Sequence, residues 1–170
     1  MANPVTEFER YRQELLAELG GDDPLAILRA TLNEIERLVA GASADQLNRA
    51  PAPGEWSPRE VLSHLADSDQ VLGVRLRMMI TQDRPVLVGY DQEAWTARFA
   101  SLDPTPQDTV DRWRVLRIAN LRVAESLAPE EWDRVGLHSE RGEESVRLHI
   151  ELLAGHDRAH LDQFRRGLRP

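Results

Sequence analysis

The 170-residue chain contains no cysteine and no lysine, and these two absences remove several kinds of chemistry. Without cysteine there is no disulfide, no thiolate nucleophile and no zinc site built from thiolates. Without lysine there is no amine for a Schiff base and no lysine to hold phosphates in a P-loop. All 21 basic residues are arginines, so the groups left for chemistry are carboxylates, hydroxyls and five histidines.

The sequence also lacks a long apolar run and a basic excess. No segment approaches the ~20 apolar residues of a membrane helix. The first residues include Glu7 and Glu9 and lack the apolar centre of a secretory signal. The net charge of -8 is opposite to that of most nucleic-acid-binding proteins. We therefore expect one cytoplasmic domain over residues 1–170 that binds neither nucleic acid nor a membrane.

The apolar residues recur every three or four positions, which predicts an all-α fold, a bundle of four helices. The four principal helices are expected near residues 23–41, 57–82, 107–127 and 145–167. A short extra helix is expected in an N-terminal extension, residues 1–21. Long connections after residues 41 and 82 favour crossover topology. No convincing sheet is expected, and residues 134–144 are taken as irregular, with a small hairpin around Gly142 as the alternative.

Three histidines are candidates for one metal site. His156 and His160 are four residues apart in the last helix, so they share a face, with Cβ atoms roughly 6 Å apart. His64 lies on the inward side of the second long helix, where a facing helix can bring it to the pair. Such a set would bind a divalent ion through three imidazole nitrogens. The alternative is that each histidine lies at a helix seam with one satisfied hydrogen bond.

The other two histidines are expected to have different roles. His149 precedes His156 by seven residues, about 10.5 Å along a helix axis. Because a zinc–nitrogen bond is only ~2.1 Å long, His149 cannot share an ion with the pair, although it can line a pocket. His138 lies in the irregular stretch and is expected to be exposed and without a role.

Several polar residues are candidates for support of the histidines. Asp67, one turn after His64, is a candidate hydrogen-bond partner of that ring, with a solvated helix residue as the alternative. Asp157 points away from the pair, and a capping box explains Glu60 better than a catalytic base does. The candidates for the wall of a pocket, with a place in the core as the alternative for the aromatic ones, are Gln163, Tyr90, Trp56 and Trp95.

Two segments resemble the signature of the DinB/YfiT-like superfamily. They are Pro53–Asp67, which reads PGEWSPREVLSHLAD, and Gly155–Gln163, which reads GHDRAHLDQ, and the resemblance extends from about Asp23 to Phe164. It implies a four-helix bundle with crossover connections, frequent dimers, and a zinc or nickel site at the positions of His64, His156 and His160. Some members are transferases or isomerases that use low-molecular-weight thiols such as bacillithiol or mycothiol. Others have no assigned function, and some are named for induction by DNA damage.

Three functions remain open at this point. The first is a metal-dependent transferase that moves an external thiol onto a small electrophile, since the chain has no thiol of its own. The second is a metal-dependent hydrolase that uses activated water. The third is a non-catalytic metal-binding protein of a stress response. The first two predict a small-molecule substrate, and the resemblance predicts a homodimer; the general base is unknown.

Overall fold

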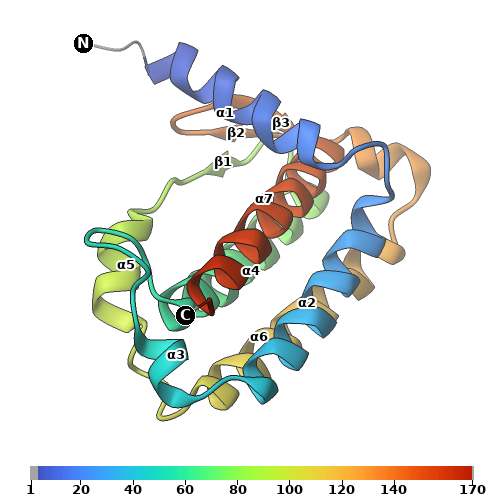
Figure 1. The fold of residues 1–170 in the computed structure, drawn as a ribbon. Helices are drawn as coiled ribbons and strands as arrows, with labels where there is room; N and C mark the ends of the chain where they lie inside the picture. Colours follow the sequence, from blue (N-terminus) through green and yellow to red (C-terminus); the bar gives the residue numbers. More distant parts are fainter. Residues whose placement is uncertain (1–3, 170) are drawn as a thin grey trace.

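Four long helices form a bundle in the computed structural model, which describes residues 4–169 (Figure 1). They are α2 (Pro24–Gly41), α4 (Pro58–Thr81), α6 (Pro106–Glu125) and α7 (Val146–Gly167). Each helix packs against two others, in the ring order α2, α7, α4, α6. The successive long helices α2 and α4 therefore lie on one diagonal, and α6 and α7 on the other. This arrangement confirms the predicted bundle with crossover connections.

The ends of the bundle helices are set by their capping residues. Ser57 begins α4: its Oγ accepts from the Glu60 backbone N–H, and its own N–H donates to Glu60 Oε2 at 2.8 Å. Pro58 occupies the first turn, where its missing N–H costs nothing. Asp23 caps α2 through its carboxylate, which accepts from the Leu25 and Ala26 backbone N–H groups, and Pro24 follows it. The capping box confirms that Glu60 serves the start of the helix, close to His64.

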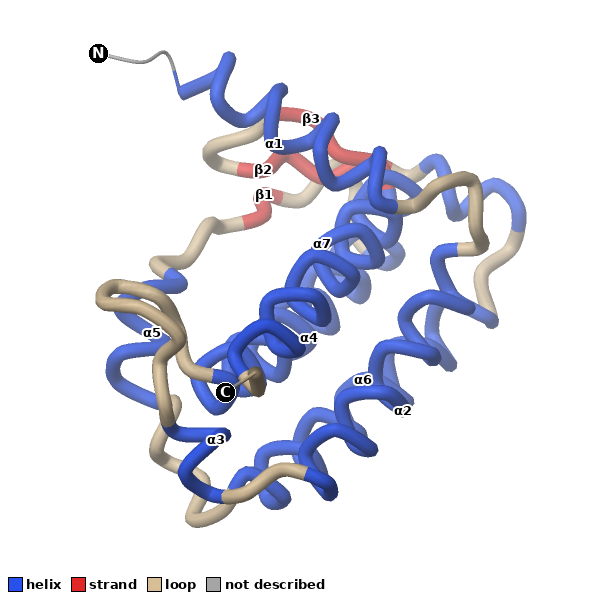
Figure 2. Tube along the Cα trace, viewed as in Figure 1, coloured by secondary structure: helices blue, strands red, loops and turns tan. Residues whose placement is uncertain are grey.

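Four shorter elements surround the bundle (Figure 2). They are α1 (Pro4–Glu18), α3 (Ala44–Asn48), α5 (Gln92–Phe99) and the 3₁₀ helix η1 (Pro129–Asp133). Helix α1 is the predicted N-terminal helix, and it packs across α7. None of the helices between residues 4 and 169 has the length and apolar character needed to cross a membrane.

The helical class is confirmed, but the prediction that no sheet forms is wrong at one end of the bundle. Strands β1 (Val86–Leu87), β2 (Val135–His138) and β3 (Gly142–Ser145) form a sheet in that order. Strands β2 and β3 are the hairpin foreseen as an alternative, with Gly142, at a φ of 83°, directly after its turn as the first residue of β3. Strand β1 pairs with β2 in parallel. A two-residue strand whose partner is about 50 positions away leaves no periodic signal in the sequence.

The core consists of two apolar clusters separated by a buried charged layer. One cluster includes Leu76, Met79 and Ile150, and the other includes Leu62 and Trp113. The charged layer between them consists of Asp69 on α4, Arg117 on α6 and Asp157 on α7, all fully buried. Arg117 donates to both Asp157 oxygens, at 2.6 and 3.1 Å, and to Asp69 Oδ2 at 2.8 Å. The layer therefore links α4, α6 and α7 and fixes the rotation of each helix about its own axis.

Candidate metal centre

Three imidazole rings converge between α4 and α7, and we call His64, His156 and His160 the histidine cluster. One ring nitrogen from each lies within 4.8 Å of the other two. The Nε2 atoms of His64 and His156 are 2.8 Å apart. His64 is buried, while His156 and His160 are partly buried. The structure thus brings together the three histidines singled out in the sequence, in an arrangement that could hold a metal ion.

The positions of these residues follow from helix geometry. His156 and His160 are one turn apart on α7, so their rings lie next to each other, with centroids 4.3 Å apart. The neighbouring residue Asp157 is rotated by about 100° around the helix and points to Arg117. The packing of α7 against α4 then places the His64 ring 4.9 Å from that of His156.

The three rings are held in the neutral form that metal binding requires. Burial, helped by the neighbouring His160, lowers the pKa of His64 to about 3. Burial also lowers the pKa of His156 well below its usual value and lowers that of His160. Because Gln163 Oε1 can only accept, His160 Nδ1 is the donor in their 2.8 Å hydrogen bond, and Nε2 keeps its lone pair. The donor set fits a divalent ion that favours imidazole.

The surroundings of the cluster match the sequence analysis in part. Gln163 orients His160, and the Trp56 ring covers the cluster, 4.9 Å from the His64 ring between centroids. The expected contact of Asp67 with His64 is absent: Asp67 accepts from Arg112 on α6 at 3.2 Å, and His64 Nδ1 has no partner among the described groups. The reason is that Asp67 faces α6, where an arginine competes for its carboxylate.

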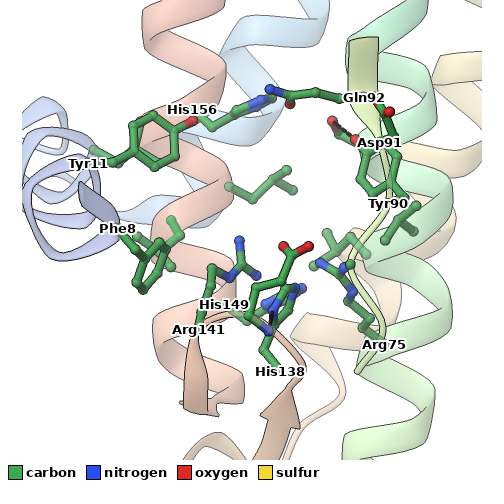
Figure 3. Close-up of a pocket in the computed structure, with 18 residues that line it drawn as sticks. Phe8, Tyr11, Arg75, Tyr90, Asp91, Gln92, His138, Arg141, His149 and His156 are labelled. Atoms are coloured by element: carbon green, nitrogen blue, oxygen red, sulfur yellow. Dashed lines mark hydrogen bonds between the residues drawn. The ribbon is translucent and has the colours of Figure 1, made fainter. Parts of the chain in front are cut away.

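A cavity of about 640 Å³ opens beside the cluster, with His156 in its wall (Figure 3). Helices α1, α4 and α7 line it, together with the hairpin and the segment before α5. Tyr90 lines it as expected: its hydroxyl lies 3.2 Å from Ser68 Oγ, and its ring packs on Trp95. His149 also lines the cavity, seven residues before His156 on α7.

The end of the cavity away from His156 is polar. The buried Glu144 carboxylate accepts from His149 Nδ1 at 3.0 Å and from Arg141 Nη2 at 2.9 Å. Burial alone would raise the pKa of Glu144, but His149 and Arg141 lower it to about 2. His138 lies here too, only 5% exposed, so its predicted exposure is wrong. It belongs to β2, whose alternating pattern turns this ring inward.

The cavity residues Arg75, Arg141 and Tyr11 were not predicted from the sequence. A signal for Arg75 was present in the chain. It follows His64 by eleven residues, close to three helical turns, so both lie on the same face of α4. The residue is an arginine within an otherwise apolar stripe. For Arg141 and Tyr11 there was no local signal, because the hairpin and α1 reach the cavity only through tertiary packing.

The crossover bundle and its histidine cluster define a class of helical proteins with a candidate metal centre. The DinB superfamily profile matches residues 27–164, and the chain belongs to this superfamily. The match covers all of α4 and α6 and most of α2 and α7, including all three residues of the cluster.

Individual relatives are similar in sequence and in fold. A protein of Oceanobacillus iheyensis named "Putative metal-dependent hydrolase" is 28% identical over 165 residues, which cover 93% of this chain and 90% of that protein. A Bacillus mycoides protein of the same description is 27% identical and covers 75% of this chain and 73% of its own length. The solved structure of YfiT from Bacillus subtilis, described as "a probable metal-dependent hydrolase with an unusual four-helix bundle topology", has a TM-score of 0.76 at 21% identity, over 85% of each chain.

Proposed function

We propose that the histidine cluster binds a divalent ion, zinc or nickel, and that the protein is a metal-dependent enzyme acting on a small molecule in the adjacent cavity. The observation that carries this proposal is the convergence of three neutral imidazoles, one of which, His156, lines a cavity of about 640 Å³. A bound ion would supply a Lewis acid that lowers the pKa of a water or thiol next to it.

The residues around the cluster prepare it for that role. Burial keeps His64 and its two partners uncharged, so their lone pairs are available near neutral pH. Gln163 fixes the tautomer of His160, and the Trp56 ring packs against His64 and His160, where it limits the access of water to the cluster. Ser68 and Tyr90 place two hydroxyl groups in the cavity wall, where they can donate to a bound substrate.

Thiol transfer to a small electrophile is the first candidate reaction. Three carboxylates close to the cluster in sequence are engaged elsewhere: Glu60 in the helix cap, Asp67 with Arg112 and Asp157 with Arg117. A general base is therefore scarce at the cluster. A thiol, with a pKa near 8.5, needs far less help than water to lose its proton. Because the chain has no cysteine, the thiol must come from a separate low-molecular-weight compound.

Hydrolysis is the second candidate, and the names of the relatives favour it. The proteins of Oceanobacillus iheyensis and Bacillus mycoides are both named as metal-dependent hydrolases. The same cluster would serve this reaction, with water in place of the thiol. A non-catalytic metal-binding role in a stress response would need the cluster but not the cavity.

Metal content and turnover test the proposal together. Elemental analysis of the purified protein should give about one zinc or nickel per chain, lost when the cluster is replaced by alanine. His138→Ala is the matched control, because it removes a buried histidine outside the cluster, and it should retain the ion. Equal metal content in the cluster variant and the control would refute the metal site.

Turnover then separates the reactions. The metal-loaded protein is assayed with bacillithiol, mycothiol, glutathione or coenzyme A and a panel of electrophiles, and separately with esters, amides and phosphates without thiol. Conjugation that depends on added thiol supports transfer, and turnover without thiol supports hydrolysis. Full metal occupancy without either activity would refute the enzymatic part of the proposal.

A further inference from the structure

We propose that Arg75, assisted by Arg141, forms a subsite for a carboxylate at the end of the cavity away from the histidine cluster. The inference rests on the proposed function, which places the reacting group of the substrate at the histidine cluster. It adds the substrate class: a small monocarboxylate with an apolar middle. Figure 3 shows Arg75 and Arg141 reaching into the cavity from opposite sides, with His138 and His149 between them and His156 at the other end.

Arg75 is a buried cation without an acidic partner. It is 8% exposed, and its Nη2 donates to the Val88 carbonyl at 2.6 Å. Its Nε is buried without a hydrogen-bond partner, and no carboxylate of the described side chains forms an ion pair with it within 4.0 Å. Burial and the neighbouring Arg141 lower the pKa of Arg75, while the more distant carboxylates of Glu144 and Glu140 oppose that shift, and arginine stays charged in proteins. A buried charge of this kind is costly unless an anion compensates it.

The groups around Arg75 favour a single negative charge. Arg141 is itself paired with Glu144, which fixes its position and offsets most of its charge. Glu140 and Asp91 also line the cavity, and their carboxylates would repel a dianion such as phosphate. His138 and His149 add no charge near neutral pH, because burial lowers the pKa of both. Of the two arginines that line the cavity, Arg75 is thus the one without an ion pair to a described carboxylate, while Glu140 and Asp91 restrict the ligand to a low negative charge.

The spacing of the two ends indicates the shape of the ligand. Arg75 lies about 16 Å beyond His64 along the axis of α4, on nearly the same face. Side chains on a helix lean toward its N-terminus, so the guanidinium points back toward the cluster and shortens this span. Between the ends an apolar strip of the wall is formed by Leu72 on α4 and by Leu152 and Leu153 on α7, beside the hydroxyls of Ser68 and Tyr90. A ligand that matches this cavity has a reacting group at the histidine cluster, several carbon atoms along the apolar strip and a carboxylate at Arg75.

A metal-free experiment tests the subsite by itself. Calorimetry on metal-free protein should show that hexanoate binds about tenfold more tightly than hexanol, because only the acid forms charge-assisted hydrogen bonds with Arg75. In Arg75→Gln this advantage should disappear, while Arg75→Lys should keep part of it. Arg114→Gln on α6 is the matched control: it removes an equal charge outside the cavity and should bind hexanoate normally.

Three results would overturn the subsite: equal binding of hexanoate and hexanol, unchanged binding by a folded Arg75→Gln, or tighter binding of inorganic phosphate than of hexanoate. Circular dichroism and thermal unfolding identify a variant that fails to fold. In that case Arg75→Lys, which keeps the charge, decides by its loss of affinity relative to the Arg114→Gln control.

A second experiment tests whether one ligand can bind the ion at the histidine cluster and Arg75 at the same time. Mercaptoalkanoic acids of increasing length are added to nickel-loaded protein, and thiolate coordination is followed by its charge-transfer absorption. Affinity should peak at an intermediate chain length in the wild type and lose that peak in Arg75→Gln. Absence of nickel binding would refute the proposed metal site and leave the hexanoate result standing. Coordination without any length dependence would instead refute the subsite and leave the metal site intact.

Discussion

Replacement of Gly155 by alanine should detach α1 from the bundle. Gly155 lies on α7 where α1 crosses it, and a Cβ atom there would be 2.0 Å from the Leu15 carbonyl oxygen. Ordinary contacts begin at 3.4 Å, so α1 would have to move by about 1.4 Å, the difference between these two distances. The obstacle is backbone, which cannot rotate away as a flexible side chain can. Arg158 resists the shift, since it donates to the Leu19 carbonyl at 2.8 Å.

Two opposing terms set the size of the effect. Alanine is favoured over glycine in a helix interior by up to about 1 kcal/mol. Overpacking of a rigid contact costs about 1–3 kcal/mol. We expect the variant to lose about 1–2 kcal/mol in the free energy of unfolding. The loss should be concentrated in α1, which carries Phe8, Tyr11 and Leu15 of the cavity wall.

Chemical denaturation and hydrogen exchange measure these two consequences. Amides of α1 should exchange faster in Gly155→Ala, while those of the other bundle helices remain protected. Gly41→Ala is the matched control: Gly41 is also helical, but nothing lies within 4 Å of its would-be Cβ, so this change should be neutral or stabilising. If Gly155→Ala resembles the control in both measurements, the close approach of α1 to α7 is refuted.

Three further predictions concern charge and metal. The pKa of Glu144 is held at about 2, below its unfolded value near 4.3, so the ionised group stabilises the fold above pH 4.5 and this contribution is lost as the pH falls toward 2. Glu144→Gln should therefore cost about 2 kcal/mol in urea unfolding at pH 7, with a difference that shrinks below pH 4.5; a constant difference would contradict the pKa. Arg117→Met should cost about 3–5 kcal/mol, because it leaves two buried carboxylates unpaired, and it should weaken metal binding measured by competition with a chelator. Removal of the ion with a chelator should lower the melting temperature of the wild type and leave that of the cluster variant unchanged.

The parts of the fold that were predictable have local signals. Ser57-Pro58 and Asp23-Pro24 mark helix starts in the sequence, and the structure begins α4 and α2 there. The one-turn spacing of His156 and His160 likewise follows from the chain alone. Their meeting with His64 depended on the crossover topology, which the sequence indicated through its long connections and through the family resemblance.

The parts that were not predictable depend on contacts between distant segments. Strand β1 exists because β2 binds it, and His138 is buried because the hairpin closes one end of the cavity. Asp67 accepts a hydrogen bond from Arg112 rather than from His64 because α6 packs against that face of α4. The spacing of residues within α4 does not reveal the position of α6. A local sequence pattern determines on which face of a helix a residue lies. Which residue it contacts there is determined by the packing of the helices.

The charged layer explains how the bundle can hold the histidine cluster in place. Apolar contacts are tolerant of small rotations, so packing between two apolar helix faces would by itself leave the rotation of α7 about its axis loosely defined. The bidentate pair of Arg117 with Asp157 is geometrically strict, and a turn of α7 would break it. Because His156 is the residue next to Asp157, the same constraint fixes where its ring points. A layer of buried ions that contributes little net stability thereby determines the position of His156 relative to His64.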